Sequence, residues 1–210
     1  MSDASATPRR RGRPRTIERT SDVEPREEIL QHAAALFSSA GVGATRLADI
    51  AASAGMSPPA IYHYFENMDA IVEALLQYVV AESAVFATAA ARRPGACAER
   101  LRSLVTQHVE RLLSGPYDLW FVAGLSEAER RRFPSVGRRA AQWRRAVARL
   151  VREGVDQGEF RPIDADLAVA AVSGLVYGAL QFRHTRGTVD AAAVADLAIR
   201  SLAADPSGRP

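Results

Sequence analysis

The sequence predicts an all-α chain, on three observations. Forty of its 210 residues are alanine, the residue with the highest helix propensity. Breaks rich in glycine and proline divide the chain into stretches of helical length. No stretch shows the sustained alternation of apolar and polar residues that is typical of strands. The hydrophobic fraction of 48% and the charged fraction of 24% are ordinary for a soluble globular protein.

The first helix is expected to start near Glu24 and to end at Gly41, a usual C-terminal residue. Pro25 lies in its first turn, where a missing N–H costs nothing. Its apolar face is Ile29, Ala33, Leu36 and Phe37. Thr45 is expected to cap the second helix, without a capping box because Ala48 stands three residues later.

A tight turn at Gly55-Met56-Ser57 separates the second helix from the third. Ser57 is expected to cap the third helix, which runs through Phe65. Asn67 is expected to cap a long fourth helix. Further breaks in the sequence predict helices over 68–92, 96–114, 117–132, 135–157, 164–183 and 188–203.

Membrane insertion and secretion are not expected. Beyond the N-terminal region, the longest uncharged run, residues 167–182, is shorter than the roughly 20 apolar residues of a membrane span. No apolar signal segment follows the N-terminus. The single cysteine, Cys97, cannot form an internal disulfide, which fits a reducing cytoplasm. It stands near a helix start, so a redox sensor is an alternative to a semi-buried small side chain.

The basic charge is concentrated at the N-terminus. All 27 basic residues are arginine, and residues 1–22 carry six of them against three acids, a net +3. The rest of the chain therefore sums to zero. We expect residues 1–22 to be a disordered arm, since they include few large apolar side chains. Arg11, Arg13 and Arg15 surround a glycine and a proline, which resembles the core of an AT-hook and suits a narrow minor groove. A solubilising tail is the alternative.

The second and third helices form a helix-turn-helix, whose second helix can enter the major groove of DNA. A helical hairpin within a core is the alternative. Tyr62, His63 and Tyr64 argue against that alternative, because their polar tips suit an exposed surface.

Residues 26–75 resemble the DNA-binding domain of the TetR family of transcriptional regulators. The matching residues are Ile29, Ala33, Ala34, Leu36, Phe37, Gly41, Thr45, Asp49, Ile50, Ala51, Ala54, Gly55, Met56, Ser57, Ile61, Tyr62, Tyr64, Phe65, Asn67, Ile71 and Leu75. The candidate DNA contacts are Arg11, Arg13, Arg15, Thr45, Arg46, Ser57, Pro58, Pro59, Ala60, Tyr62, His63 and Tyr64.

Three features depart from the family pattern. Met68 stands where the family usually has a lysine that touches a phosphate, and Pro58-Pro59 replaces a polar residue and glycine. Residues 23–70 hold two arginines against six acids, a net −4 that DNA would repel. The arm and the N–H groups at helix starts would therefore carry unusual weight.

Beyond that domain, the resemblance implies an effector pocket. Bulky residues on facing helices of an alanine-rich bundle can line a cavity, although core packing is the alternative for each. The candidates are Tyr78, Phe86, His108, Trp120, Phe121, Trp143 and Tyr177, with His108 as a polar anchor or, alternatively, an ordinary satisfied or solvated histidine. Arg138, Arg145, Arg149 and Arg152 share a helix face, which is either solvated or a partner for an anionic effector such as an acyl-coenzyme A.

Ala170, Gly174 and Gly178 recur every four residues on the penultimate helix. Glycine inside a helix costs about 1 kcal/mol relative to alanine, so two glycines need a packing reason. The resemblance implies that the last two helices pair with those of a second subunit. Packing within one chain is the alternative.

No catalytic or metal-binding pattern is found: the chain has no P-loop and no nucleophile elbow, and its four histidines lack metal-site spacing. We therefore expect no cofactor, no metal and no enzyme activity. We expect a disordered arm (1–22), a DNA-binding domain (23–70), an effector-binding and dimerisation domain (71–204) and a flexible tail (205–210). The predicted function is a homodimeric repressor that a small apolar or amphipathic effector releases from a palindromic operator. A helical adaptor protein without DNA binding is the alternative.

Overall fold

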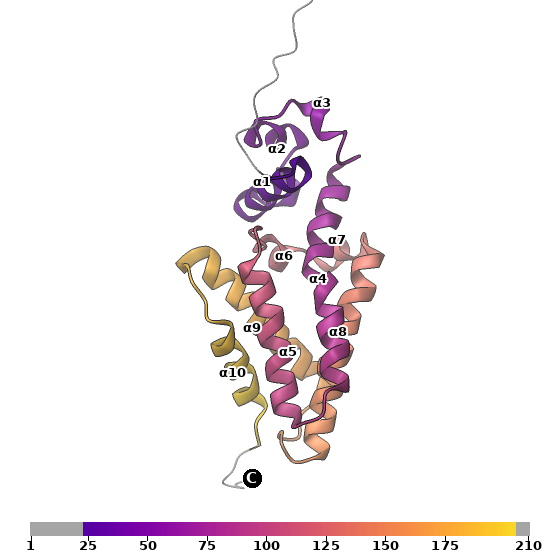
Figure 1. Ribbon diagram of the computed structural model, residues 1–210, viewed down its shortest axis with the longest axis vertical. Helices are drawn as coiled ribbons and strands as arrows, with labels where there is room; N and C mark the ends of the chain where they lie inside the picture. Colours follow the sequence, from indigo (N-terminus) through magenta and orange to yellow (C-terminus); the bar gives the residue numbers. More distant parts are fainter. Residues whose placement is uncertain (1–22, 205–210) are drawn as a thin grey trace, which may run out of the picture.

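The computed structural model describes residues 23–204, which form a small helical unit stacked on a larger helical bundle (Figure 1). The small unit consists of α1 (Pro25–Ala40), the 3₁₀ turn η1 (Val42–Ala44), α2 (Leu47–Ser53) and α3 (Pro58–Ile61). Helix α4 (Met68–Arg92) starts in this unit and continues into the bundle. The predicted boundary after residue 70 therefore falls within one helix. The predicted arm and tail lie outside the described residues.

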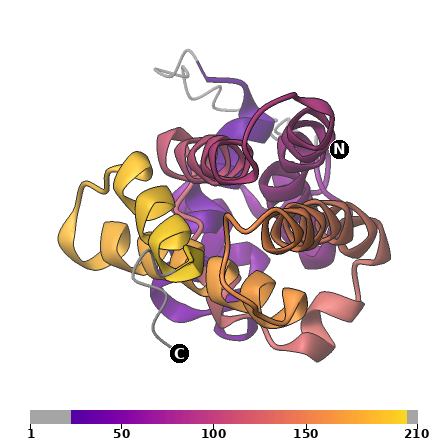
Figure 2. The same ribbon diagram turned by 90° about the horizontal axis from the view of Figure 1, so that it is seen from below.

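The bundle is built around α4 and six further helices of different length. They are α5 (Cys97–Ser114), α6 (Phe121–Gly124), α7 (Glu127–Arg131), α8 (Pro134–Asp156), α9 (Ala165–Arg186) and α10 (Ala191–Leu202). Figure 2 looks along the bundle from below, with α9 and α10 together at one side. Residues 23–204 contain helices and one isolated β-bridge, between Phe160 and Ala203. The predicted all-α fold is confirmed.

The predicted helix over 117–132 is wrong, whereas the ends of the other bundle helices agree with prediction to within three residues. A loop and two short helices replace it. Ser126 starts α7 with a capping box: its Oγ accepts from the Glu129 N–H, and a Glu129 carboxylate oxygen accepts from the Ser126 N–H. This box stops α6 from continuing, and its Ser-x-x-Glu pattern was a signal in the sequence.

The start of α2 also differs from prediction, because Arg46 rather than Thr45 is the N-cap residue. Asp49 Oδ2 accepts a hydrogen bond from the Arg46 N–H at 2.8 Å. The Thr45 hydroxyl donates instead to the Gly41 carbonyl at 2.9 Å, which ties the turn between α1 and α2.

Helix α3 is shorter than predicted: it ends at Ile61, and residues 62–64 form a turn. Ser57 is its N-cap residue as predicted, but the Ser57 side chain accepts no hydrogen bond from the helix. The predicted cap of α4 is confirmed, since Asn67 Oδ1 accepts from the Ala70 N–H at 2.9 Å.

Three side chains of α1 also contact the bundle directly. The rings of Phe37 in α1 and Phe121 in α6 meet edge to face at 5.3 Å between centroids. The Ser38 hydroxyl donates to the Asp118 carbonyl and accepts from the Phe121 N–H, both at 3.1 Å. The Tyr117 hydroxyl donates to a carboxylate oxygen of Glu27 in α1 at 2.7 Å. The α6 segment is therefore in direct contact with α1.

Two helices, over Met68–Ala90 and Ala165–Arg186, are long and apolar enough to cross a membrane by length and composition alone. A count of uncharged residues in the sequence misses them, because each helix includes isolated charges. Both helices pack against α8 inside the bundle. Core helices of soluble proteins pass the same test, so this feature is weak support for a membrane span.

Candidate functional site

The turn after α3 presents polar and aromatic side chains to solvent at the end of the molecule farthest from the bundle (Figure 1). Tyr62 is 57% exposed and Tyr64 is 41% exposed, because Ile61 and Phe65 on either side are buried and fix the turn. Of the other candidate DNA contacts in this part of the chain, Arg46, Ser57, Pro58, Pro59 and His63 are exposed and Ala60 is half-buried. Hydroxyls and aromatic edges placed in this way can contact phosphates and bases.

The candidate Thr45 does not fit a DNA contact. Its side chain is buried and its hydroxyl donates to Gly41, so it shapes the turn instead. The predicted contacts Arg11, Arg13 and Arg15 lie outside the described residues.

The acidic charge of the small unit is partly engaged within the molecule. Asp69 binds the Arg132 side chain, which comes from the end of α7. Asp49 accepts from a backbone N–H, and Glu27 accepts from Tyr117. The sum over residues 23–70 therefore overstates the negative charge that DNA would meet, because Arg132 adds a positive charge from outside that segment.

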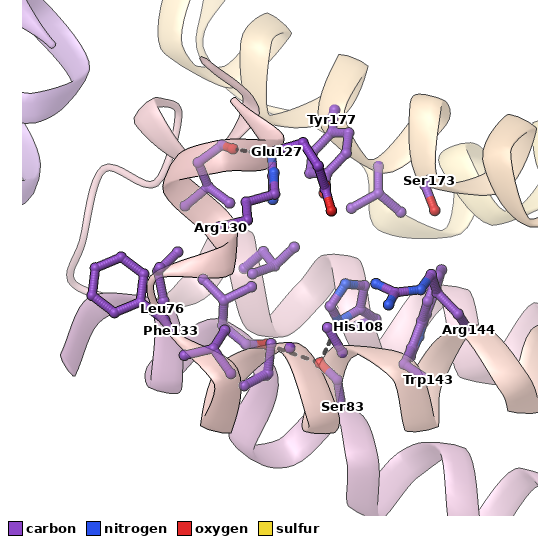
Figure 3. A pocket seen from close by; sticks show the side chains of 18 of the residues that line it. Leu76, Ser83, His108, Glu127, Arg130, Phe133, Trp143, Arg144, Ser173 and Tyr177 are labelled. Carbon is purple, nitrogen blue, oxygen red and sulfur yellow. Dashed lines mark hydrogen bonds between the residues drawn. The ribbon is translucent and has the colours of Figure 1, made fainter. Parts of the chain in front are cut away.

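A cavity of about 460 Å³ lies inside the bundle between α4, α5, α7, α8 and α9 (Figure 3). Most of its wall is apolar. The apolar lining includes Leu76, Val79, Val80, Leu112, Val122, Phe133, Val136, Ala140, Trp143, Val176 and Leu180. The polar and charged lining residues are Ser83, His108, Glu127, Arg130, Arg131, Arg144, Ser173 and Tyr177. A cavity of this size and character is typical of a site for a small organic molecule.

Three of the seven candidate pocket residues line this cavity: His108, Trp143 and Tyr177. Figure 3 shows His108 and Trp143 on one side of the cavity and Tyr177 on the other. Sequence reasoning missed Ser83 and Ser173. Each is a lone serine on an otherwise apolar helix face, and that pattern was the signal in the sequence for a polar group in the cavity wall.

The other four candidates lie elsewhere, so their assignment to the pocket is corrected. Tyr78 is on the opposite side of α4 from the lining residues and meets the Tyr117 ring at 4.7 Å between centroids. Phe121 packs on Phe37, and Trp120 stacks near His184. Phe86, three residues beyond Ser83 along α4, packs against the core. An aromatic side chain alone does not show which helix face will border the cavity.

His108 is the most buried ionisable group of the cavity wall. Its Nδ1 lies 2.6 Å from the Ser83 hydroxyl oxygen, and its ring centroid is 5.0 Å from that of Trp143. Burial lowers the pKa of His108 to about 4, because the charged imidazolium loses its hydration. The imidazole is therefore neutral at physiological pH.

Arg130 connects the cavity to the small unit. Its Nε donates to the Leu125 carbonyl at 3.1 Å, and its guanidinium also donates to the Val122 carbonyl at 2.6 Å. The guanidinium carbon lies 5.7 Å from the centroid of the Tyr177 ring. Arg130 and Val122 both line the cavity, and Val122 belongs to α6, which packs on α1.

Helix α9 carries an unpartnered small and apolar strip, defined here as Leu167, Ala170, Ala171, Gly174, Gly178 and Phe182. All six residues are exposed, and a Cβ placed at either glycine would have no neighbouring atom within 4 Å. The glycines therefore do not serve packing within the described part of the chain. On the neighbouring α10, Leu197 is 54% exposed.

Cys97 is buried, and burial raises the pKa of its thiol. A buried thiol that stays protonated is a poor redox sensor. Within residues 23–204, no three His, Cys, Asp or Glu side chains gather as metal ligands would.

Comparison with known proteins assigns these features to one family. Residues 29–75 match the family model "Bacterial regulatory proteins, tetR family", and residues 94–204 match "Tetracyclin repressor-like, C-terminal domain". The chain belongs to the TetR family. As a TetR family member it is a DNA-binding transcriptional regulator and not an enzyme. The alternative of an adaptor that does not bind DNA is thereby set aside.

Individual TetR proteins are similar to this chain over most of its length. It is 27% identical over 175 residues to the HTH-type transcriptional repressor KstR2 of Mycobacterium tuberculosis strain H37Rv, covering 79% of this chain and 84% of the relative. The crystal structure of Mycobacterium smegmatis AmtR has a TM-score of 0.74 at 29% identity, covering 92% of this chain and 91% of that one. AibR in complex with isovaleryl coenzyme A and operator DNA has a TM-score of 0.67 at 20% identity, covering 85% and 98%.

Proposed function

We propose that this TetR regulator is a ligand-responsive repressor that binds a palindromic operator as a homodimer and leaves it when an effector fills the bundle cavity. The observation that carries this proposal is the path from cavity to DNA-binding unit. Arg130 in the cavity wall holds two carbonyls of the α6 segment, and Phe121 of α6 packs on Phe37 of α1.

The exposed strip on α9 supports the dimer. Its glycines and alanines leave room for close approach of another helix, and Leu167 and Phe182 at its ends supply apolar area. Two copies that pair through α9 and α10 would present two copies of the exposed turn that follows α3. A dimer with two-fold symmetry would place these in successive major grooves of a palindromic site.

The cavity supports an amphipathic effector with an apolar body and an anionic group. The wall is mostly aliphatic, whereas Arg131 and Arg144 in its lining are exposed. Arg138, Arg145 and Arg152 are exposed farther along α8 and could hold further phosphates. AibR, which shares the fold, is described with isovaleryl coenzyme A. An acyl-coenzyme A or a related lipophilic acid is therefore the effector class that we propose.

The effector would act by population shift. Because it contacts both the bundle helices and Arg130, it would bind most tightly to one placement of α6 and α1. If that placement separates the two recognition turns by the wrong distance, the operator affinity falls. The shift cannot exceed the difference in effector affinity between the two states. Such a regulator would act in the cytoplasm, where bacterial DNA lies.

A DNA-release experiment tests this proposal. The operator would be selected from random DNA fragments with the purified protein, labelled, and followed by fluorescence anisotropy while decanoyl-coenzyme A or decanoate is added. Gly137 lines the cavity, and a Cβ added to it would meet open space, so Gly137→Leu should abolish release while keeping DNA binding. Arg139→Leu, two residues along on the far side of α8, is the matched control and should release normally. Normal release by Gly137→Leu would remove the cavity from the mechanism.

A further inference from the structure

The two serines of the cavity wall have no proton left for a ligand. The Ser83 hydroxyl oxygen lies 2.9 Å from the Val79 carbonyl oxygen, and that of Ser173 lies 2.8 Å from the Val169 carbonyl oxygen. Each hydroxyl donates its single proton to its carbonyl, which only accepts. Both serines can therefore only accept a further hydrogen bond.

With Ser83 donating to Val79, only one tautomer of His108 makes a hydrogen bond with Ser83. Its Nδ1 lies 2.6 Å from the Ser83 hydroxyl oxygen. Because the Ser83 hydroxyl donates its proton to the Val79 carbonyl, its contact with His108 is a hydrogen bond only if Nδ1 carries a proton and donates it. The neutral imidazole has one proton, and burial keeps it neutral by lowering its pKa to about 4. Nε2 is then an unprotonated acceptor.

His108 Nε2 has no hydrogen-bond partner among residues 23–204, although the residue is only 9% exposed. Figure 3 shows the imidazole in the cavity wall, beside Ser83 and on the same side as Arg144. A ligand that donates to this acceptor from inside the cavity would gain a hydrogen bond.

We propose that the effector is a hydroxylated amphiphile, a hydroxy acid or its thioester, whose O–H donates to Nε2 of His108. This inference rests on the proposed effector function of the cavity. A carboxylate or a ketone oxygen at this position would place one acceptor against another. The anionic group instead belongs with the arginines of the lining, Arg131 and Arg144, which only donate.

The first test is independent of any ligand. Nitrogen-15 NMR of the full-length protein, with histidine labelled and His108 assigned through the His108→Phe spectrum, reports which ring nitrogen carries the proton. We expect a protonated Nδ1 and an unprotonated Nε2 at neutral pH. A proton on Nε2 would overturn the proposal, since the wall would then offer a donor.

The second test compares matched probes: decanoate and a series of hydroxydecanoates that differ in the position of the hydroxyl group. One net hydrogen bond corresponds to roughly threefold to tenfold in affinity, so calorimetry should show at least one hydroxydecanoate binding tighter than decanoate by that factor. His108→Phe keeps a ring but lacks the acceptor, and it should bring the affinities for decanoate and the hydroxydecanoates together. Ser173→Ala, which changes the other serine, should retain the preference.

The outcomes separate the two proposals. If decanoate binds but no hydroxydecanoate binds tighter, or if His108→Phe keeps the preference, the hydroxyl inference falls and the effector cavity stands. If no probe binds to the cavity, the proposed effector class falls and takes this inference with it.

Discussion

The guanidinium of Arg130 donates to the carbonyl oxygen of Val122 at 2.6 Å, so a residue of α7 holds α6 from the cavity side. Carbonyls that accept from a charged donor are bound about twice as strongly as those that accept from a neutral one. The residue before Val122 is Phe121, whose ring packs on α1. One side chain therefore connects the effector space with the DNA-binding unit.

Replacing Arg130 should uncouple effector binding from DNA release. Arg130→Met keeps a long apolar stem but cannot hold the two carbonyls of the α6 segment. We expect decanoyl-coenzyme A to bind within a fewfold of its normal affinity in calorimetry, while the same concentration releases much less operator DNA in anisotropy. Arg139→Met, at an exposed position of α8 outside the cavity lining, is the control and should release normally. Equal release by both variants would exclude Arg130 as the connecting residue.

The α9 strip predicts the effect of bulky substitutions on assembly. Gly174→Leu and Gly178→Leu place a large side chain where the described chain leaves open space, so the monomer fold should be kept. Close approach of a second α9 should be blocked. Light scattering should report monomers, circular dichroism should report unchanged helix content, and operator binding should be lost. Ala89→Leu, at an exposed position of α4, should remain dimeric. Dimers of normal stability in both glycine variants would place the interface elsewhere.

Local signals in the sequence were enough for most helices but not for the cavity. Asn67 and Gly41 mark helix ends through contacts with their own neighbours, and such contacts can be read from a few residues. Membership of the cavity depends on how α4 is rotated against α5 and α8. That rotation places Val79 and Ser83 in the wall and turns Tyr78 away from it. Tertiary packing sets this rotation, and the positions of aromatic residues in the sequence do not predict it.

Two further differences have the same origin. Thr45 was expected to cap α2, but the Gly41 carbonyl across the turn accepts its hydroxyl proton instead. The acidic charge of residues 23–70 is offset in part by Arg132, which is more than sixty residues away in sequence from its partner Asp69. The net charge of a segment and the rules for helix caps consider only neighbouring residues, so they leave out partners that folding brings from elsewhere in the chain.

His108 predicts a loss of stability at low pH. Its pKa is about 4 in the folded protein, against 6.5 for a histidine in water. The unfolded chain therefore binds more protons between these values, so stability is full above pH 6.5 and falls as the pH drops toward 4. The difference corresponds to roughly 3 kcal/mol. Urea unfolding at about pH 7 and about pH 4.5 should show a smaller loss in His108→Phe than in the wild type. Identical losses would mean that His108 is hydrated in the folded state.

The N-terminal arm has a charge opposite to that of the small unit. Residues 1–22 carry six arginines, whereas residues 23–70 carry a net −4, so the arm would supply most of the positive charge for phosphates. Each phosphate that an arginine neutralises contributes about 0.9 to the slope of log affinity against log salt concentration. If three arginines of each arm engage DNA, deletion of residues 1–20 should flatten this slope by about five units per dimer.

The deletion should cost more affinity at low salt than at high salt, because counterion release drives the lost contacts. If the arm lies in a narrow minor groove, its loss should also weaken the preference for A·T-rich flanks and leave the core of the operator unchanged. Anisotropy titrations of full-length and truncated protein on one operator, across a salt series, measure both effects. A variant with Arg11, Arg13 and Arg15 changed to glutamine keeps the length of the arm and should behave like the deletion. Parallel slopes for all three proteins would show that the arm is a passive tail, and the operator would then be held by Arg46, the exposed turn and helix N-termini alone.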